Sequence, residues 1–132
     1  MNNEELGTFG ARYAAAWCSQ NSESVAAFFE EKGSLKINAG RPSVGRAAIT
    51  AAAQSFMTAF PDMIVSMDEV SANKGGAVFR WTLVGTNTGP GGTGNRVRIS
   101  GFEEWEFGNN GLVGESRGHF DEADYQRQLS GS

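Results

Sequence analysis

Apolar residues recur at two different spacings along the chain, and the change of spacing divides it into two parts. Up to residue 60 the spacing is helical. It predicts an amphipathic helix over about 4–18 and a second helix that starts at Asn21 or Ser22 and ends at Gly33. A short alternating segment, 34–38, predicts a strand, and a third helix is predicted to end at Pro61.

From residue 63 onward, apolar and polar residues alternate as they do in strands. Four strands are predicted, over 63–72, 77–87, 95–107 and 112–121, and a short helix over 122–129 follows them. Glycine-rich and Asn-Gly segments join the strands. Helices followed by an antiparallel meander predict the α+β class, with N-terminal helices packed on a strongly curved, mostly antiparallel sheet in one domain spanning residues 1–132.

The alternation also predicts which side chains of the second and third strands point inward. Phe79, Trp81 and Trp105 fall on apolar faces, and Glu103 falls in the middle of one of them. A charge among aromatic rings costs several kcal/mol unless it is paired or protonated. Burial should therefore raise the pKa of Glu103. The alternative is a β-bulge near Gly101 that turns Glu103 to solvent.

Ionisable residues occupy every second position of the last strand. They are Glu115, Arg117, His119 and Asp121. The opposite face carries small and apolar residues, so the cost of burying charge places the charged row outside. Gly114 and Gly118 on the inner face leave room for the floor of a pocket, and Asp121 at the strand end is a candidate for its rim.

The composition excludes several classes of function. Lys+Arg 11 against Asp+Glu 15 gives a net charge of −4 without a basic cluster, so no nucleic-acid partner is expected. One His and one Cys predict neither a disulfide nor a thiolate metal site. No apolar run of membrane-spanning length and no leader is predicted, so a cytoplasmic protein is expected. The Gly-rich segment 89–94 lacks a Gly-Lys-Ser/Thr ending and a following helix, and is interpreted as a hairpin loop.

Several segments together resemble one known family in their order and spacing. They are RYAAAWCSQNSESVAAFFEEKGSLKI, GRPSVGRAAI, FPDM, RWTLVGTNTGPGGTGNRV and GLVGES, followed by an aspartate and QRQL. The chain resembles, over residues 9–129, the SnoaL-like polyketide cyclase group of the nuclear transport factor 2-like superfamily, which includes ketosteroid isomerases and limonene epoxide hydrolases. The resemblance implies a cone-shaped α+β barrel that holds an apolar ligand, often in a homodimer.

The resemblance also implies roles for individual residues. Ketosteroid isomerases stabilise an oxyanion with a tyrosine and a protonated acid, and Tyr13 and Glu103 match these two places. Their general base corresponds to Asn38, which cannot abstract a proton. The late-strand aspartate of the cyclases corresponds to Asp121 or, in a shifted register, to Gly118.

The epoxide hydrolases place their catalytic groups at positions that here hold Gly85, Asn87 and Gly118, so their chemistry is not expected. Two hypotheses remain. One is an enzyme without a cofactor that acts on a small hydrophobic carbonyl compound, with Asp121 or His119 moving the proton. The other is a binding domain with the same pocket and no chemistry.

Both hypotheses predict an apolar pocket. Its expected lining is Trp17, Phe56, Phe60, Phe79, Trp81 and Phe120, and Asn38 is a further candidate ligand-binding residue. The outer face of the sheet carries Val78, Val84 and Phe102, which predicts a homodimer through the sheet.

Overall fold

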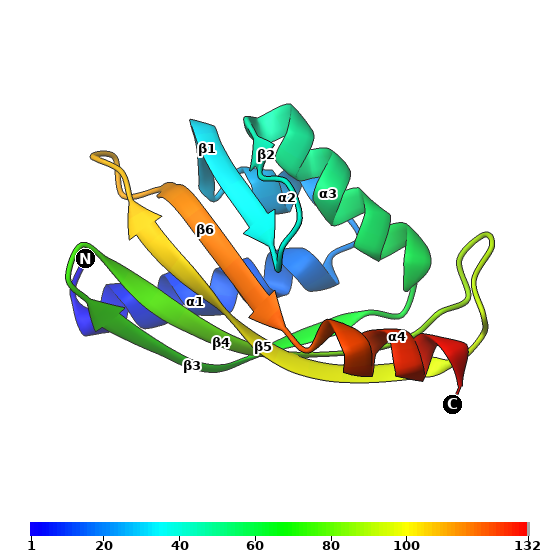
Figure 1. Ribbon diagram of the computed structural model, residues 1–132. Helices are drawn as coiled ribbons and strands as arrows, with labels where there is room; N and C mark the ends of the chain where they lie inside the picture. The colour runs from blue at the N-terminus through cyan, green and yellow to red at the C-terminus, as the bar shows by residue number, and fades with distance from the viewer. Residues whose placement is uncertain (132) are drawn as a thin grey trace.

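The computed structural model describes residues 1–131 as four helices and one six-stranded sheet (Figure 1). The elements are α1 (Asn3–Cys18), α2 (Ser22–Ala26), β1 (Phe29–Ile37), β2 (Ser43–Val44), α3 (Arg46–Ala59), β3 (Ile64–Asn73), β4 (Gly76–Thr86), β5 (Arg96–Phe107), β6 (Val113–Phe120) and α4 (Glu122–Ser130). The strand order is β2-β1-β6-β5-β4-β3, and only the β1–β6 pair is parallel. The predicted α+β class is confirmed. The sheet is strongly curled into a cone but not closed into a barrel, because β2 and β3 remain edge strands.

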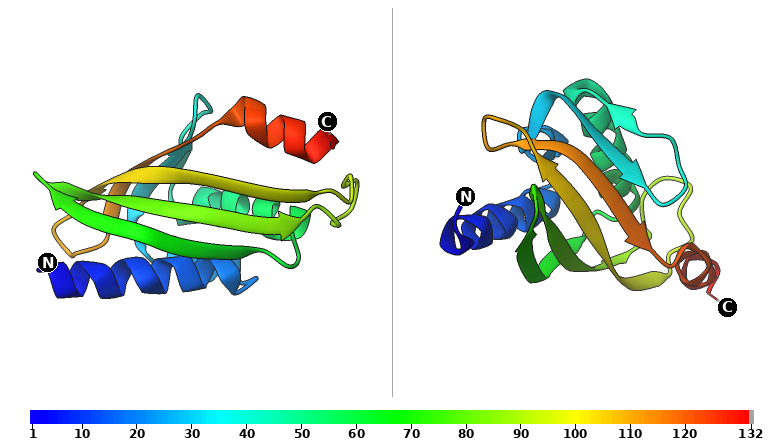
Figure 2. Two further views of the ribbon diagram at one scale, coloured as in Figure 1. Left: turned by 90° about the horizontal axis from the view of Figure 1, so that it is seen from below. Right: turned by 60° about the vertical axis from the view of Figure 1, so that its left-hand side comes forward.

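Helices cover the inner face of the curled sheet. Figure 2 shows α1 running along the sheet beside β3, while α3 packs against β1 and β2. The short α4 lies beside the first half of β5, where β6 no longer pairs with it. There the Gln128 amide accepts from the backbone N–H of Arg98 and donates to its carbonyl, which satisfies a free strand edge. Within residues 1–131 no helix is long and apolar enough to cross a membrane.

Helix α1 begins at a capping box. The Asn2 side chain accepts from the backbone N–H of Glu5, and the Glu5 carboxylate accepts from the backbone N–H of Asn2. One face of the helix is buried, and Tyr13 and Trp17 project from it toward the sheet. The first helix is therefore formed as its spacing predicts.

The second predicted helix is shorter than expected. It ends at Ala26, and Phe29 is the first residue of β1 rather than part of a helical inner face. Gly33 lies inside β1, at an irregularity in the pairing with β6, where an added Cβ would lie 2.9 Å from the Val113 carbonyl oxygen. Two adjacent apolar residues, Phe28 and Phe29, are compatible both with the end of a helix and with the start of a strand. Pairing with β6 favours the strand. The two-residue β2 was not predicted.

Strands β4 and β5 pair residue for residue along their whole length. Phe79 and Trp105 are buried on the inner face, as the alternation predicts. The bulge that would have turned Glu103 to solvent does not occur, and Glu103 is 7% exposed. Gly101 has another role: an added Cβ would lie 2.7 Å from Cζ2 of Trp81, so the glycine lets this ring lie on β5.

Strand β6 departs from its predicted phase at one end. A register shift against the end of β5 places Val113 in the core, while the predicted inward residue Leu112 is half-buried. Gly114 adjoins the carboxylate of Glu30 and does not contribute to a pocket floor. From Ser116 to the end of the strand the predicted phase is confirmed.

Candidate functional site

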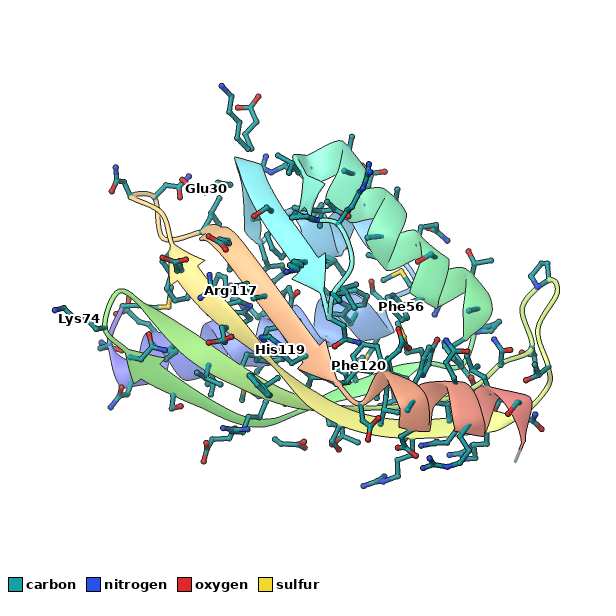
Figure 3. The ribbon with its side chains drawn as sticks, viewed as in Figure 1. Glu30, Phe56, Lys74, Arg117, His119 and Phe120 are labelled. Carbon is teal, nitrogen blue, oxygen red and sulfur yellow. The ribbon has the colours of Figure 1, made fainter. Side chains whose placement is uncertain are left out.

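A small apolar cavity lies between the inner face of the sheet and the helices α1 and α3. Its volume is about 60 Å³. Five of the predicted lining residues border it, namely Trp17, Phe56, Phe79, Trp81 and Phe120. Figure 3 labels Phe56, which reaches the cavity from α3, and Phe120, which reaches it from the end of β6.

Two of the predicted ligand-binding residues, Phe60 and Asn38, do not line the cavity. Phe60 is fully buried, packs on Gly85 and contacts the Tyr125 ring, so it belongs to the core. Asn38 is not part of the lining. It lies next to the cavity, where its Oδ1 accepts from the backbone N–H of Phe120.

Glu103 brings a carboxyl group to this apolar surface. Its Oε1 accepts from the Tyr13 hydroxyl at 2.9 Å, from the Ser116 hydroxyl at 2.6 Å and from Trp105 Nε1 at 3.0 Å. Its Oε2 lies 3.1 Å from the Tyr13 hydroxyl. Three buried donors from α1, β5 and β6 therefore hold one carboxyl group in a fixed position.

Strand pairing determines the space around Glu103. Its neighbours across the sheet are Phe79 on β4 and Gly118 on β6. An added Cβ at Gly118 would lie 3.7 Å from Cγ of Glu103. The absence of a side chain at Gly118 keeps one side of the carboxyl group open toward the cavity, which both residues line. Of the two glycines predicted to form the pocket floor, Gly118 therefore lines the cavity and Gly114 does not.

Burial sets the electrostatics of the pair. Desolvation raises the pKa of the Glu103 carboxyl above its ordinary value, and the hydrogen bonds from Ser116, Trp105 and Tyr13 offset this only in part. The pKa of Tyr13 is raised well above 10.0, first by burial and then by the nearby Glu103 charge. Tyr13 therefore remains a donor, while Glu103 is suited to exchange a proton closer to neutral pH than an exposed glutamate.

The position of Tyr13 differs from what the resemblance implied. Its side chain is fully buried and does not line the cavity, and its hydroxyl donates to Glu103. Tyr13 and Glu103 are brought together as predicted, but they do not both face a ligand. Tyr13 is a positioning residue for Glu103.

Ser116 and Trp105 are the two partners of Glu103 that the sequence interpretation missed. They face each other across β5 and β6 on the inner face. The signal was present in the phase of β6, because Ser116 is a polar residue on the face predicted to be buried. A buried hydroxyl needs a partner, and the nearby inward carboxyl group was a candidate for it.

A family model described as SnoaL-like polyketide cyclase matches residues 9–129. The chain belongs to this family. No match was found among curated proteins.

Solved structures show the same fold for this SnoaL-like protein. A Catenulispora acidiphila protein with a ketosteroid isomerase-like fold, in complex with trimethylamine, superposes with a TM-score of 0.81 at 14% identity, over 97% of this chain and 94% of that one. SalBIII, an epoxide hydrolase/cyclase-like enzyme of pyran ring formation in the polyether salinomycin, superposes with a TM-score of 0.78 at 17% identity, over 93% of this chain and 95% of that one. TsrD from Streptomyces laurentii superposes with a TM-score of 0.84 at 16% identity, over 100% of this chain and 99% of that one.

His119 and Asp121 lie outside the cavity of this SnoaL-like protein. His119, which Figure 3 labels, is on the outer face. Its Nε2 lies 2.8 Å from Glu104 Oε1, and its ring stacks on Phe102. Asp121 is exposed and caps α4 by accepting from the backbone N–H of Asp124. The expectation that either residue moves a proton in the pocket is corrected, because one faces the other side of the sheet and the other is bound in a helix cap.

The homodimer through the outer face stays a prediction. Phe102, the large apolar residue of that face, lies between the His119 ring at 4.7 Å and the Arg80 guanidinium at 5.4 Å. Part of the apolar surface that suggested a partner is thus covered within the chain itself.

The predicted outward direction of the charged row is confirmed at Arg117. Its Nη1 lies 2.8 Å from carboxylate oxygens of both Glu106 and Glu115, and its Nε lies 3.9 Å from Glu104. The hydrogen bond from Arg117 is the main cause that lowers the pKa of Glu106. All four side chains are more than one third exposed.

Changing Arg117 to alanine should therefore alter the free energy of unfolding by less than about 1 kcal/mol, because solvent and salt screen exposed ion pairs. Urea denaturation of the wild type and the variant measures this difference. Arg80→Ala serves as a control, since among the described residues Arg80 forms one exposed ion pair, with Glu69, and its guanidinium also lies over the Phe102 ring. A loss of several kcal/mol in Arg117→Ala would show that the row is buried.

Proposed function

We propose that this SnoaL-like protein binds a small apolar carbonyl compound in the cavity and moves a proton at the carbon next to the carbonyl. Glu103 is the acid–base group. One observation carries the proposal: among the described residues that line the cavity, Glu103 is the one with an ionisable side chain. The raised pKa of Glu103 and its three fixed donors support the same role.

The chemistry needs one group that both accepts and returns a proton. The Glu103 carboxylate takes a proton from the carbon next to the carbonyl, and the bonding electrons form an enolate whose charge rests on the carbonyl oxygen. Return of the proton to another carbon gives an isomer. If the enolate carbon instead attacks a second carbonyl of the same molecule, a ring closes and the new alkoxide takes the proton from Glu103.

The size of the cavity limits the ligand. One water molecule takes roughly 10–15 Å³ of such space, so the cavity of about 60 Å³ holds a compound of about four to six heavy atoms. Cyclopentanone, which has six heavy atoms, is a suitable first ligand. Larger ketones would require the Phe56 and Phe120 side chains to move apart.

Exchange of hydrogen for deuterium next to the carbonyl tests the proposal without knowledge of the natural substrate. A panel of small cyclic ketones and enones is incubated with the protein in D2O, and proton NMR follows loss of the signal. We expect faster exchange with the wild type than with Glu103→Gln, and wild-type rates with Glu104→Gln, which changes the neighbouring residue on the outer face. If no panel member exchanges faster with the wild type than with Glu103→Gln, the proposed proton transfer is wrong.

A binding domain without chemistry is the second candidate. It is favoured by the burial of Tyr13, whose hydroxyl donates to Glu103 and does not reach the cavity to stabilise an enolate oxygen. Trp17 and Trp81 border the cavity, so quenching of their fluorescence reports occupancy. Saturable quenching by ketones that show no exchange would identify the protein as a binding domain.

A further inference from the structure

The outer face of β5 carries charges of opposite sign at its two ends. Its outward side chains are, in chain order, Arg96, Arg98, Ser100, Phe102, Glu104 and Glu106. Strand β5 pairs with β4 from residue 96 to residue 106 without a bulge, so these alternate residues share one face. The face therefore has a positive end, an aromatic ring near its centre and a negative end.

The negative end carries more charge than its own chain neutralises. The Arg117 guanidinium of β6 lies beside three carboxylates, those of Glu104, Glu106 and Glu115. His119, which adjoins Glu104, adds a positive charge only when it is protonated. With a neutral His119, three carboxylates against one guanidinium leave an excess of two negative charges.

The positive end has the opposite imbalance. Arg98 is exposed and has no ion-pair partner within residues 1–131. Arg96 is also exposed and is only weakly engaged by Asp62, because the lowered pKa of that carboxyl is due first to hydrogen bonding from Thr86 and least to Arg96. A face with an unneutralised charge of each sign at opposite ends is complementary to a copy of itself turned end to end.

A two-fold axis over Gly101 makes the charges meet in pairs. With β5 antiparallel to the β5 strand of a second copy, residues equally far from Gly101 lie opposite each other. Arg98 then faces the partner's Glu104, and Arg96 faces the partner's Glu106. Packed sheets lie about 10 Å apart with their strands within about 30° of each other, a distance that arginine and glutamate side chains span together.

The neighbouring strand has the same symmetry. On β4, Trp81 pairs with Gly101, and Val78 and Val84 lie on the outer face at equal distances before and after it. The axis that joins the charges therefore also places Val78 of one copy opposite Val84 of the other. Two rows of the face, one charged and one apolar, are thus matched by a single operation.

No described helix covers this face. In the left view of Figure 2, β3, β4 and β5 lie in front of α3, and the chain places no helix before them. The ring of Phe102 is half-buried between the His119 ring and the Arg80 guanidinium, so apolar contact alone is a weak basis for association. The charges supply the specificity that the apolar residues of the face lack.

We propose that two copies of this chain associate through the outer faces of their sheets, with antiparallel β5 strands, a two-fold axis over Gly101, and reciprocal Arg98–Glu104 and Arg96–Glu106 ion pairs. The proposal goes beyond the homodimer that the apolar residues predict, because it fixes the register and the orientation of the two copies. It also makes association depend on charge.

Reversing single charges tests the register. Arg98→Glu places a glutamate opposite the partner's Glu104, and Glu104→Arg places an arginine opposite the partner's Arg98. Sedimentation velocity over a range of protein concentrations measures the dissociation constant of the dimer. We expect each variant alone to raise this constant by at least about tenfold, because like charges then meet at both symmetric positions.

Mixing the two variants should restore association. In a pair made of one Arg98→Glu chain and one Glu104→Arg chain, each of these glutamates faces an arginine, so we expect the mixture to dimerise about as well as the wild type. Arg12→Glu, which reverses an exposed charge of α1 on the other side of the sheet, is the control and should dimerise like the wild type. Variants that remain dimeric alone, or a mixture that remains monomeric, would overturn the register.

The salt dependence of the wild type is a second test that needs no variant. High salt screens exposed charges, so we expect the dissociation constant to rise at least about tenfold between low and high NaCl concentration. A dimer that salt leaves unchanged would overturn the ion pairs, and a monomer at low salt would overturn the interface. The interface lies across the sheet from the cavity, so none of these outcomes alters the proton exchange expected of Glu103.

Discussion

Replacing Glu103 with leucine should lower the free energy of unfolding by about 3–5 kcal/mol. The carboxyl group is the acceptor for the Tyr13 and Ser116 hydroxyls and for the Trp105 indole, and all three residues are at most 1% exposed. Leucine has a similar volume but accepts no hydrogen bond. Three donors would then be left unpaired among aromatic rings, which outweighs the gain from removing a desolvated carboxyl group.

Glu103→Gln is the control for this loss. Glutamine keeps one oxygen as an acceptor, so we expect a loss of less than about 2 kcal/mol. Glu104→Leu, on the outer face beside Arg117 and His119, controls for the change from glutamate to leucine and should have little effect. Urea denaturation measures all three variants. A Glu103→Leu variant as stable as the wild type would mean that the hydrogen bonds to Glu103 contribute no net stability.

Glu103→Gln should also lower the rate of ketone proton exchange by about 10²–10⁴-fold, the usual contribution of a general acid–base group. An amide does not accept a proton near neutral pH. Tyr13→Phe should reduce the rate less, because it leaves the carboxyl group and removes one of its donors. The hydrogen bond from Tyr13 lowers the pKa of Glu103, so its removal should raise that pKa further. The rise of exchange rate with pH should then have a higher midpoint in Tyr13→Phe than in the wild type.

The exchange rate is measured by proton NMR as a function of pH, with Glu104→Gln as the control for a lost surface charge. A shift in the midpoint of the rate–pH curve would show that Tyr13 positions Glu103, whereas a merely structural role of Tyr13 would not move this midpoint. A Tyr13→Phe variant with an unchanged midpoint and a loss as large as that of Glu103→Gln would contradict the account. Tyr13 would then act on the substrate directly.

The inner faces of β4 and β5 could be predicted because their pairing contains no bulge. Strict alternation over more than ten residues of each strand predicted that Phe79, Trp105 and Glu103 lie on the buried side, and all three are buried in the structure. The boundary between α2 and β1 could not be predicted in this way. Phe28 and Phe29 are adjacent, so helical and extended conformations each bury one of them, and pairing with β6 decides the outcome.

The cavity lining shows a similar limit. Phe56 and Phe60 lie on one apolar stripe, but only Phe56 borders the cavity. Which of them does so depends on how α3 lies against the sheet, and periodicity carries no information about this. For His119 the phase of β6 predicted the outer position, while the lack of a base at Asn38 kept His119 as a candidate. In the structure His119 lies on the outer face, as the alternation along β6 predicts.

Titration of the Glu103 carboxyl group by carbon-13 NMR in the ligand-free protein is the most direct test of the central claim, that Glu103 is a desolvated acid–base group facing the cavity. Glu103→Gln assigns the signal. We predict a midpoint above 4.5, because burial disfavours the charged form. The folded state then binds this proton more tightly than the unfolded state, so the contribution of Glu103 to stability should fall as pH rises from about 4.5 through the midpoint. A midpoint at or below 4.5 would contradict the account, since it would show a solvated or fully compensated carboxylate.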